Sequence, residues 1–317
     1  MSMPIEDIIA DLCDSSQPLS NTKLVELSNL NSEELELWQQ VWASIEPKRR
    51  RQIIYRLVEL AEGNFELDFD SIFRNGLNDP DAEVKSKAIE GLWESEDSSL
   101  IGLFVNLLKQ DSSESVQASA ATALGKFAML AELNKLRSSH ASKVSQALLG
   151  VIGDKDRAVE VRRRALEAAA PLSLPRVEKA IEEAYQRHNR QLKISAIYAM
   201  GKNCSRSWLP ILLRELSSTD AEIRYEAAGA CGELGEEAAS PYLVKRIDDP
   251  DVDVQVAALQ ALGKIGGGEA KECLQRCLNN PSEVIRQVAE QALGELEAEE
   301  STRTFRVESL AKYDYRQ

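Results

Sequence analysis

The stretch DPDVDVQVAALQALGKIG, from Asp249 to Gly266, contains the pattern that decides the fold. It opens with an Asp-Pro-Asp turn signal, in which an aspartate can cap a helix and a proline is tolerated because the first helical N–H groups are unpaired. Apolar residues follow at intervals of three and four, at Val254, Ala258, Ala261 and Leu262. This spacing places them on one stripe of a helix with about 3.6 residues per turn. The stretch therefore predicts a turn followed by an amphipathic helix.

The same pattern recurs along most of the chain. With Val254 as position 0 of a unit, the equivalent residues lie 31 or 32 residues apart, with one interval of 45: Val84, Val116, Val161, Leu192, Ile223, Val254 and Ile285. Position 4 is alanine in every unit, and position 7 is glycine or alanine, which predicts close approach of neighbouring helices. Apolar-periodic segments such as WLPILLREL, from Trp208, precede the turns. Each unit is therefore predicted to be a helix, a tight turn and a second helix.

These units resemble HEAT repeats, on the evidence of an Asp-containing turn followed by the Val, Ala and Ala-Leu-Gly positions, seen again in SSTDAEIRYEAAGACGELG from Ser217. More narrowly, they resemble the short bacterial HEAT-like repeats found in phycobilin lyases and in many proteins of unknown role. The period of 31 residues is shorter than the roughly 40 to 47 residues of full HEAT or armadillo units. The resemblance covers about residues 65–297, some seven units. It implies an all-α fold, a right-handed alpha-alpha superhelix in which each hairpin buries its apolar stripe against its neighbours.

The remaining segments complete the predicted organisation. Residues 1–64 form an N-terminal helical cap, in which Asn31 and Glu34 make a capping-box signature and Pro47 starts a further helix. Residues 65–297 hold the repeats, with an insertion near 129–143 that accounts for the long interval, and residues 298–317 are a C-terminal tail that begins as the end of the last helix. The insertion is either an exposed loop without a role or part of a binding face.

Composition narrows the classes of function. The 317 residues carry a net charge of -14 and are 43% hydrophobic, without an apolar run that could span a bilayer. The acidic N-terminus lacks a secretory signal, and five scattered cysteines make no disulfide framework, so we expect a cytoplasmic protein without a membrane role. Nucleic acid is an unfavourable partner for an acidic chain, although residues 101–200 carry a net charge of +5 between segments of -12 and -7.

Position 1 is basic or an amide in every unit. The HEAT resemblance implies that this side chain pairs with a turn aspartate and links adjacent repeats. The residues of this structural ladder are Asp79, Asp111, Asp156, Asp249, Lys85, Arg162, Lys193, Arg224 and Arg286. Gln117 and Gln255 occupy the same column, and Arg187, Ser218 and Asn280 replace the aspartate in three units. The alternative is a row of cations that binds phosphate groups.

Apolar and aromatic residues occupy outward positions of the predicted second helices in the middle of the array. On a helical wheel, positions 2 and 6 point away from the apolar stripe, yet they hold Ile194, Tyr198, Tyr225 and Val256. The resemblance places second helices on the concave face, so these residues are predicted to bind a partner there, with Arg163 attracting an acidic partner. The alternatives are that neighbouring helices cover the strip and that Arg163 belongs to a solvated face.

Catalytic patterns are weak. His140 and His188 lie outside any metal-ligand or triad motif, and Cys273 with Cys277 lacks a second ligand pair nearby in sequence. We therefore expect no catalytic residues, metal or cofactor, and a monomeric, non-enzymatic scaffold or adaptor that binds a protein or peptide segment in its concave groove. Two alternatives stay open: a bilin lyase or chromophore chaperone, and a HEAT-like DNA glycosylase or nucleic-acid binder.

Overall fold

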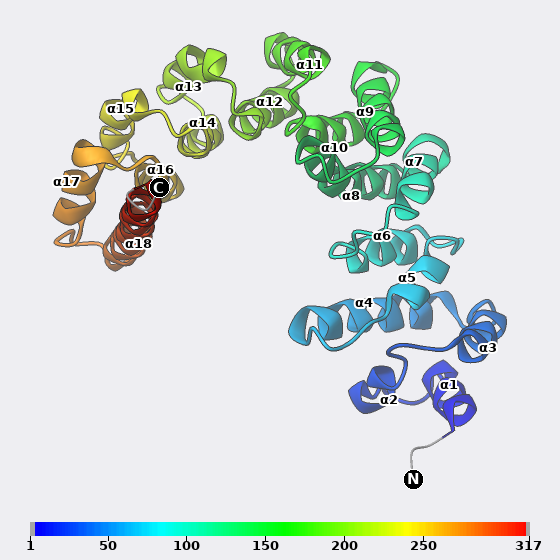
Figure 1. The fold of residues 1–317 in the computed structure, drawn as a ribbon. Coiled ribbons are helices and arrows are strands. Elements are labelled where there is room, and N and C mark those ends of the chain that lie inside the picture. Colours follow the sequence, from blue (N-terminus) through cyan, green and yellow to red (C-terminus); the bar gives the residue numbers. More distant parts are fainter. Residues whose placement is uncertain (1–3, 315–317) are drawn as a thin grey trace. The chain divides into compact units, whose positions relative to one another are not determined.

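The computed structural model describes residues 4–314, with side chains up to Ala298 and at Ser301. Within this range the regular elements are eighteen α-helices and two short 3-10 helices, and no strand occurs (Figure 1). The predicted all-α fold is confirmed. None of the helices in residues 4–314 is both long and apolar enough to cross a membrane.

Four helices precede the first repeat: α1 (Ile5–Cys13), α2 (Asn21–Val25), α3 (Ser32–Trp42) and α4 (Pro47–Gly63). The predicted capping box is present at the start of α3. The Asn31 side chain accepts hydrogen bonds from the backbone N–H groups of Glu33 and Glu34, and the Glu34 carboxylate accepts one from the Asn31 N–H at 2.9 Å. Pro47 occupies the first position of α4, as its fixed φ favours.

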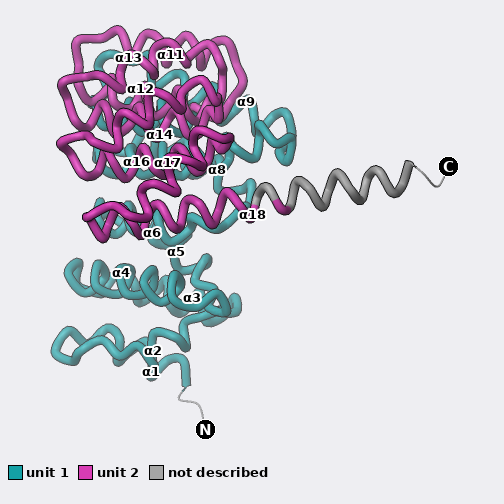
Figure 2. Tube along the Cα trace, turned by 90° about the vertical axis from the view of Figure 1, so that its left-hand side faces the viewer, with its two compact units in different colours: residues 1–169 teal, residues 170–317 magenta. Residues whose placement is uncertain are grey.

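Seven helical hairpins follow, three of them in the first of two compact units. Figure 2 distinguishes the units, which are residues 1–169 and 170–317. The hairpins of the first unit are α5 (Asp70–Gly76) with α6 (Ala82–Gly91), α7 (Leu100–Gln110) with α8 (Glu114–Glu132), and α9 (Ser138–Gly153) with α10 (Val159–Ala169). The insertion near 129–143 forms no long loop, because α8 and α9 lengthen and only residues 133–137 lie between them.

The second unit contains four hairpins. They are α11 (Pro175–Gln186) with α12 (Arg190–Asn203), α13 (Leu209–Glu215) with α14 (Ala221–Leu234), α15 (Ser240–Val244) with α16 (Val252–Ile265), and α17 (Gly267–Cys277) with α18 (Glu283–Asp314). The 3-10 helices η1 (Arg206–Trp208) and η2 (Glu237–Ala239) lead into α13 and α15. α18 includes the predicted tail as far as Asp314, and residues 315–317 of that tail lie outside the described residues.

Turn aspartates cap the second helices, as the repeated turn signal predicts. The Asp220 side chain accepts a hydrogen bond from the Glu222 N–H at 3.1 Å, and the Asp251 side chain accepts one from the Asp253 N–H at 2.9 Å. These bonds satisfy N–H groups that have no partner within their own helix. The local sequence of these turns therefore sets where the second helix begins, and Asp81 caps α6 in the same way.

Small residues set how closely consecutive second helices approach. In four repeats position 9 is a glycine that lies against the position 7 alanine of the next repeat: Gly125, Gly201, Gly232 and Gly263. A Cβ atom built on Gly201 would lie 2.7 Å from the Ala230 Cα, and one on Gly232 would lie 2.8 Å from the Ala261 Cα. The small column at position 7 therefore has the predicted effect. Its glycine partner at position 9 is part of the same interface.

Candidate functional site

A ladder of ion pairs joins consecutive repeats at the turn ends of their second helices. Arg224 forms two hydrogen bonds with the Asp249 carboxylate, at 2.7 and 2.8 Å, and the side chain of Asp249 is fully buried. Lys85 pairs with Asp111 in the same way one unit apart. Asp79 is bound from the cap, by Arg50 at 2.9 Å and by the Trp42 indole N–H at 2.7 Å. Sequence reasoning missed this last link because α4 lies outside the repeat register.

The ladder changes its chemistry where the aspartate is absent. Lys193 pairs at 2.9 Å with Glu215, a buried residue at the end of α13, and the Tyr185 hydroxyl also donates to that carboxylate. Burial would raise the pKa of Glu215, but the hydrogen bonds from Tyr185 and Lys193 outweigh it and hold the pKa below its ordinary value. Glutamate from the preceding helix thus replaces the turn aspartate.

The expected role of Asp156 is wrong. Its side chain is exposed, and the link at this point is reversed: Arg157 donates to the Gln117 side chain at 2.9 Å and to the Lys109 carbonyl at 2.9 Å. The Gln117 amide donates to the Asp111 carbonyl of its own turn at 2.6 Å, and its side-chain oxygen accepts the hydrogen bond from Arg157.

The remaining ladder cations contact their own repeats. Arg162 donates to the Ile152 carbonyl at 3.2 Å, and Arg286 donates to the Asn280 carbonyl at 2.8 Å. All five predicted ladder cations thus have protein partners, which favours the structural interpretation over a row of phosphate-binding cations. Arg163, the predicted attractor of acidic partners, lies in the first unit and pairs with Glu160 at 2.8 Å.

The predicted apolar strip is only partly present. Ile194 is 5% exposed and belongs to the core, so its expected exposure is wrong. The helical wheel treats one helix in isolation, whereas in a stack the helices on both sides cover its flanks. Val256 is half-buried, while Tyr198 is 38% and Tyr225 is 43% exposed.

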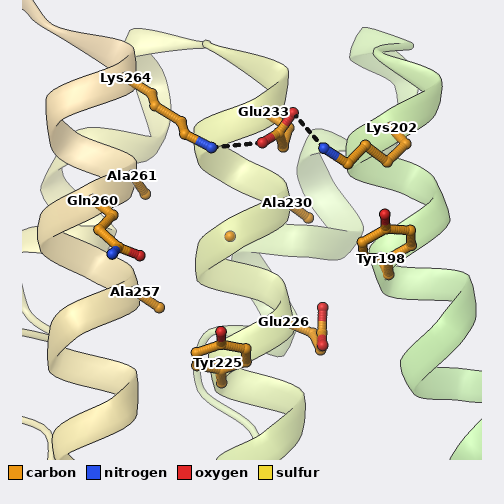
Figure 3. A pocket seen from close by; sticks show the side chains of 11 residues that line it. Tyr198, Lys202, Tyr225, Glu226, Ala230, Glu233, Ala257, Gln260, Ala261 and Lys264 are labelled. Atoms are coloured by element: carbon orange, nitrogen blue, oxygen red, sulfur yellow. Dashed lines mark hydrogen bonds and ion pairs between the residues drawn. The ribbon is translucent and has the colours of Figure 1, made fainter. Parts of the chain in front are cut away.

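The two tyrosines line one groove of about 250 Å³ on the second unit (Figure 3). Tyr198 comes from α12 and Tyr225 from α14, and Ala257 and Ala261 of α16 contribute to the lining. Gly229 of α14 has no atom within 4 Å of where its Cβ would lie, so the middle of the groove is open. Small side chains between two exposed rings give the groove its depth.

Charged side chains close one end of this groove, where Figure 3 shows Glu233 between two lysines. Lys202 and Lys264 contact the two carboxylate oxygens of Glu233 at 3.0 and 2.6 Å. Burial would raise the pKa of Glu233, but these two hydrogen bonds outweigh it and keep the pKa below its ordinary value. The three residues share position 10 of consecutive repeats, a signal of alternating charge in the sequence that the strip hypothesis overlooked.

The described residues contain no group of three or more His, Cys, Asp or Glu side chains arranged to hold a metal ion. Cys273 and Cys277 lie buried in α17. Burial, together with the neighbouring Cys273, raises the pKa of Cys277 to about 11, so its thiol is protonated at neutral pH. The groove of the second unit thus combines aromatic rings, small side chains and an ion triad.

Comparison with known proteins agrees with this architecture. A family model for HEAT repeats matches residues 71–148 and 209–294, and no curated protein matches by sequence. The chain is similar to the Kap95:Nup1 complex (TM-score 0.51, 14% identity, 97% of this chain and 48% of that one). It is also similar to importin beta (TM-score 0.50, 16% identity, 91% and 43%). The CpcE and CpcF complex of phycocyanin lyase from Nostoc sp. PCC7120 gives a TM-score of 0.45 at 19% identity, covering 61% and 76%. At these identities the likeness concerns the fold, and this chain covers 48% of the chain from the Kap95:Nup1 complex and 43% of importin beta.

Proposed function

The chain belongs to the HEAT repeat proteins, and from this premise we propose that it is a protein-interaction scaffold that binds a segment of a partner protein in the groove of its second unit. The observation that carries the proposal is the exposure of Tyr198 and Tyr225 across a floor of small side chains on adjacent second helices. Tyrosine is over-represented among the residues that dominate binding energy at protein interfaces, because it offers a large contact area at low cost in side-chain entropy.

The surroundings of the two rings support a protein ligand. Lys202 lies 5.9 Å from the centre of the Tyr198 ring and also pairs with Glu233, so the ring and the charged end of the groove are held together. A partially apolar centre with a charged rim is the usual composition of a protein interface. Glu233 is kept ionised between two lysines, which suits it to accept hydrogen bonds rather than to transfer a proton.

The fold is compatible with this role. Kap95:Nup1, which shares the arrangement of helical hairpins, is a complex of two proteins. HEAT-type arrays present long surfaces made of successive second helices, and a partner segment can contact several repeats at once.

Replacement of both groove tyrosines tests the proposal. Tyr198→Ala with Tyr225→Ala should remove proteins that the wild-type chain captures from an extract of its source organism, while helical circular dichroism stays unchanged. Tyr242→Ala is a matched control, because Tyr242 is 44% exposed on α15 and does not line the groove. Each captured protein is then purified and titrated against the variants. Equal affinity for the double variant and the wild type would refute a groove-bound partner.

A further inference from the structure

The first unit contains a second and larger groove, with a volume of about 660 Å³. Two aromatic side chains stand in it: Tyr55 of α4, 44% exposed, and Trp93, which follows α6 and is 59% exposed. They are 38 positions apart in the sequence, and only the stacking of α4 against α6 brings them to one surface. These two rings, one from the cap and one from the first repeat, offer flat apolar faces to a ligand.

The floor of this groove is small and weakly polar. It is formed largely by α8, through Ala118, Ser119, Thr122 and Ala123. None of these side chains can fill the space between the aromatic rings. A ligand can therefore lie close to the backbone of α8 while its apolar groups contact Tyr55 and Trp93.

Every charged side chain that lines the groove already has a partner of opposite charge. The pairs are Lys87 with Glu90 at 2.7 Å, Arg164 with Glu160 at 2.8 Å, and Glu83 with Arg51 at 2.9 Å. The unit as a whole carries 19 basic and 28 acidic side chains, a net charge of -9. An anionic ligand would meet no unpaired cation and a repulsive field, so an uncharged ligand, with neutral or basic flanks, complements this surface.

The two aromatic residues also offer hydrogen-bond donors. Among the described residues, neither the indole N–H of Trp93 nor the hydroxyl of Tyr55 has a hydrogen-bond acceptor. A proline-rich segment supplies carbonyl acceptors and has few backbone N–H groups of its own to satisfy. It is also extended before it binds, so it loses little conformational entropy, and it commonly docks in grooves lined by aromatic side chains.

The size of the groove suits a short segment of a partner chain. The groove has a volume of about 660 Å³, within the range of about 300–1,000 Å³ in which pockets enclose small ligands. A few residues of an extended chain fit this space.

Lysine side chains contact both aromatic residues. The Lys126 ammonium donates a hydrogen bond to the Trp93 backbone carbonyl at 2.8 Å and another to the Glu94 carbonyl, which fixes the backbone beside the indole. The Lys87 ammonium lies 5.0 Å from the centre of the Tyr55 ring. A backbone that is already positioned loses less entropy when a ligand binds.

We propose that the groove of the first unit binds an extended, uncharged, proline-rich segment of a partner protein, whose pyrrolidine rings stack on Trp93 and Tyr55. The carbonyls of the segment accept hydrogen bonds from the two aromatic side chains. This site is separate from the groove of the second unit and does not depend on the function proposed for that groove.

Tryptophan fluorescence of the full chain provides a direct test. Of the four tryptophans, Trp38, Trp42 and Trp208 are at most 6% exposed, so Trp93 is the indole that acrylamide reaches readily. Titration with decaproline should saturably reduce acrylamide quenching and shift the emission to shorter wavelength. A glycine–serine decapeptide should do neither. If decaproline gives no saturable protection, or if an amphipathic helical peptide protects Trp93 and decaproline does not, the proposal is overturned.

Variants locate the binding site. Fluorescence anisotropy with labelled decaproline should show an affinity about five- to thirtyfold weaker for Trp93→Ala and for Tyr55→Ala, the range for loss of an aromatic anchor. Phe65→Ala is the matched control, since Phe65 is 85% exposed in the same unit and lies outside the groove. The double variant of Tyr198 and Tyr225 should bind decaproline as the wild type does. Unchanged affinity in Trp93→Ala and Tyr55→Ala, with normal circular dichroism, would refute the site.

Discussion

The contact between consecutive second helices leads to a quantitative prediction about two glycines of α14. A Cβ atom on Gly232 would lie 2.8 Å from the Ala261 Cα, at least about 0.6 Å closer than the 3.4–4 Å of ordinary contact. Because the atom it meets belongs to the backbone of α16, the two helices must move apart. Gly229 lies three residues earlier in α14 and would meet nothing within 4 Å.

The two alanine substitutions should therefore have opposite effects. Gly229→Ala gains helix propensity, about 0.5–1 kcal/mol, without a new contact. Gly232→Ala gains a similar or smaller amount but adds an overpacking cost of about 1–3 kcal/mol, as extra methyl groups do in closely packed interiors. Because both substitutions gain about the same helix propensity, this gain largely cancels when the two variants are compared. Gly232→Ala should therefore be about 1–3 kcal/mol less stable than Gly229→Ala.

Urea unfolding followed by circular dichroism measures this difference, with hydrogen exchange of α14 and α16 as the local measurement. The local measurement matters because repeat arrays can unfold in parts rather than in one cooperative step. Faster exchange in both α14 and α16 is expected for Gly232→Ala alone. If Gly232→Ala is as stable as Gly229→Ala and protects the two helices equally well, close backbone packing does not set the spacing of these repeats.

Three further predictions concern the ladder and the cysteines. Arg224→Ala should cost about 3–5 kcal/mol because it leaves the buried Asp249 carboxylate without its partner, whereas Arg190→Ala, which removes an exposed pair, should cost about 1 kcal/mol or less; urea midpoints compare them. Burial opposes ionisation of Asp249, but the hydrogen bonds and charge of Arg224 outweigh it, so the pKa of Asp249 in the folded protein lies below its ordinary value. The stability that this ion pair contributes is therefore complete above the ordinary aspartate pKa and is lost as pH falls through the lower native pKa. Asp249→Asn should flatten the acid part of a stability–pH curve. Burial raises the pKa of Cys231 to about 12, so native protein at pH 8 should leave this thiol unmodified by Ellman's reagent, whereas the exposed Cys204 reacts; rapid modification of Cys231 before unfolding would contradict its burial.

Features that depend on neighbours in the chain were predictable from the sequence. The turn aspartates, the capping box at Asn31 and the small residues at position 7 act within one helix or at a fixed repeat interval, so periodicity reveals them. The Arg224 and Asp249 link was also predictable, because both residues recur at constant positions.

Features that depend on several helices at once were not. Ile194 occupies an outward position on an isolated helical wheel, yet it is buried. Asp156 matches the aspartate column, but Arg157 makes the link to Gln117 in its place. The repeat pattern shows which residues occupy equivalent positions, whereas the hydrogen bonds depend on the side chains that meet there: Gln117 is a neutral amide, and an arginine pairs with it.

The sequence by itself determined the repeat unit, the all-α class and the positions at which neighbouring backbones approach, because these follow from local propensity and a regular period. Only the tertiary structure decided which side chains stay exposed and which meet. The groove of Tyr198 and Tyr225 requires helices from successive repeats to stack, and the groove of Tyr55 and Trp93 requires α4 of the cap to stack against α6 of the first repeat. A helical period records the direction of a side chain around its own axis, whereas a groove requires the positions of two or more axes.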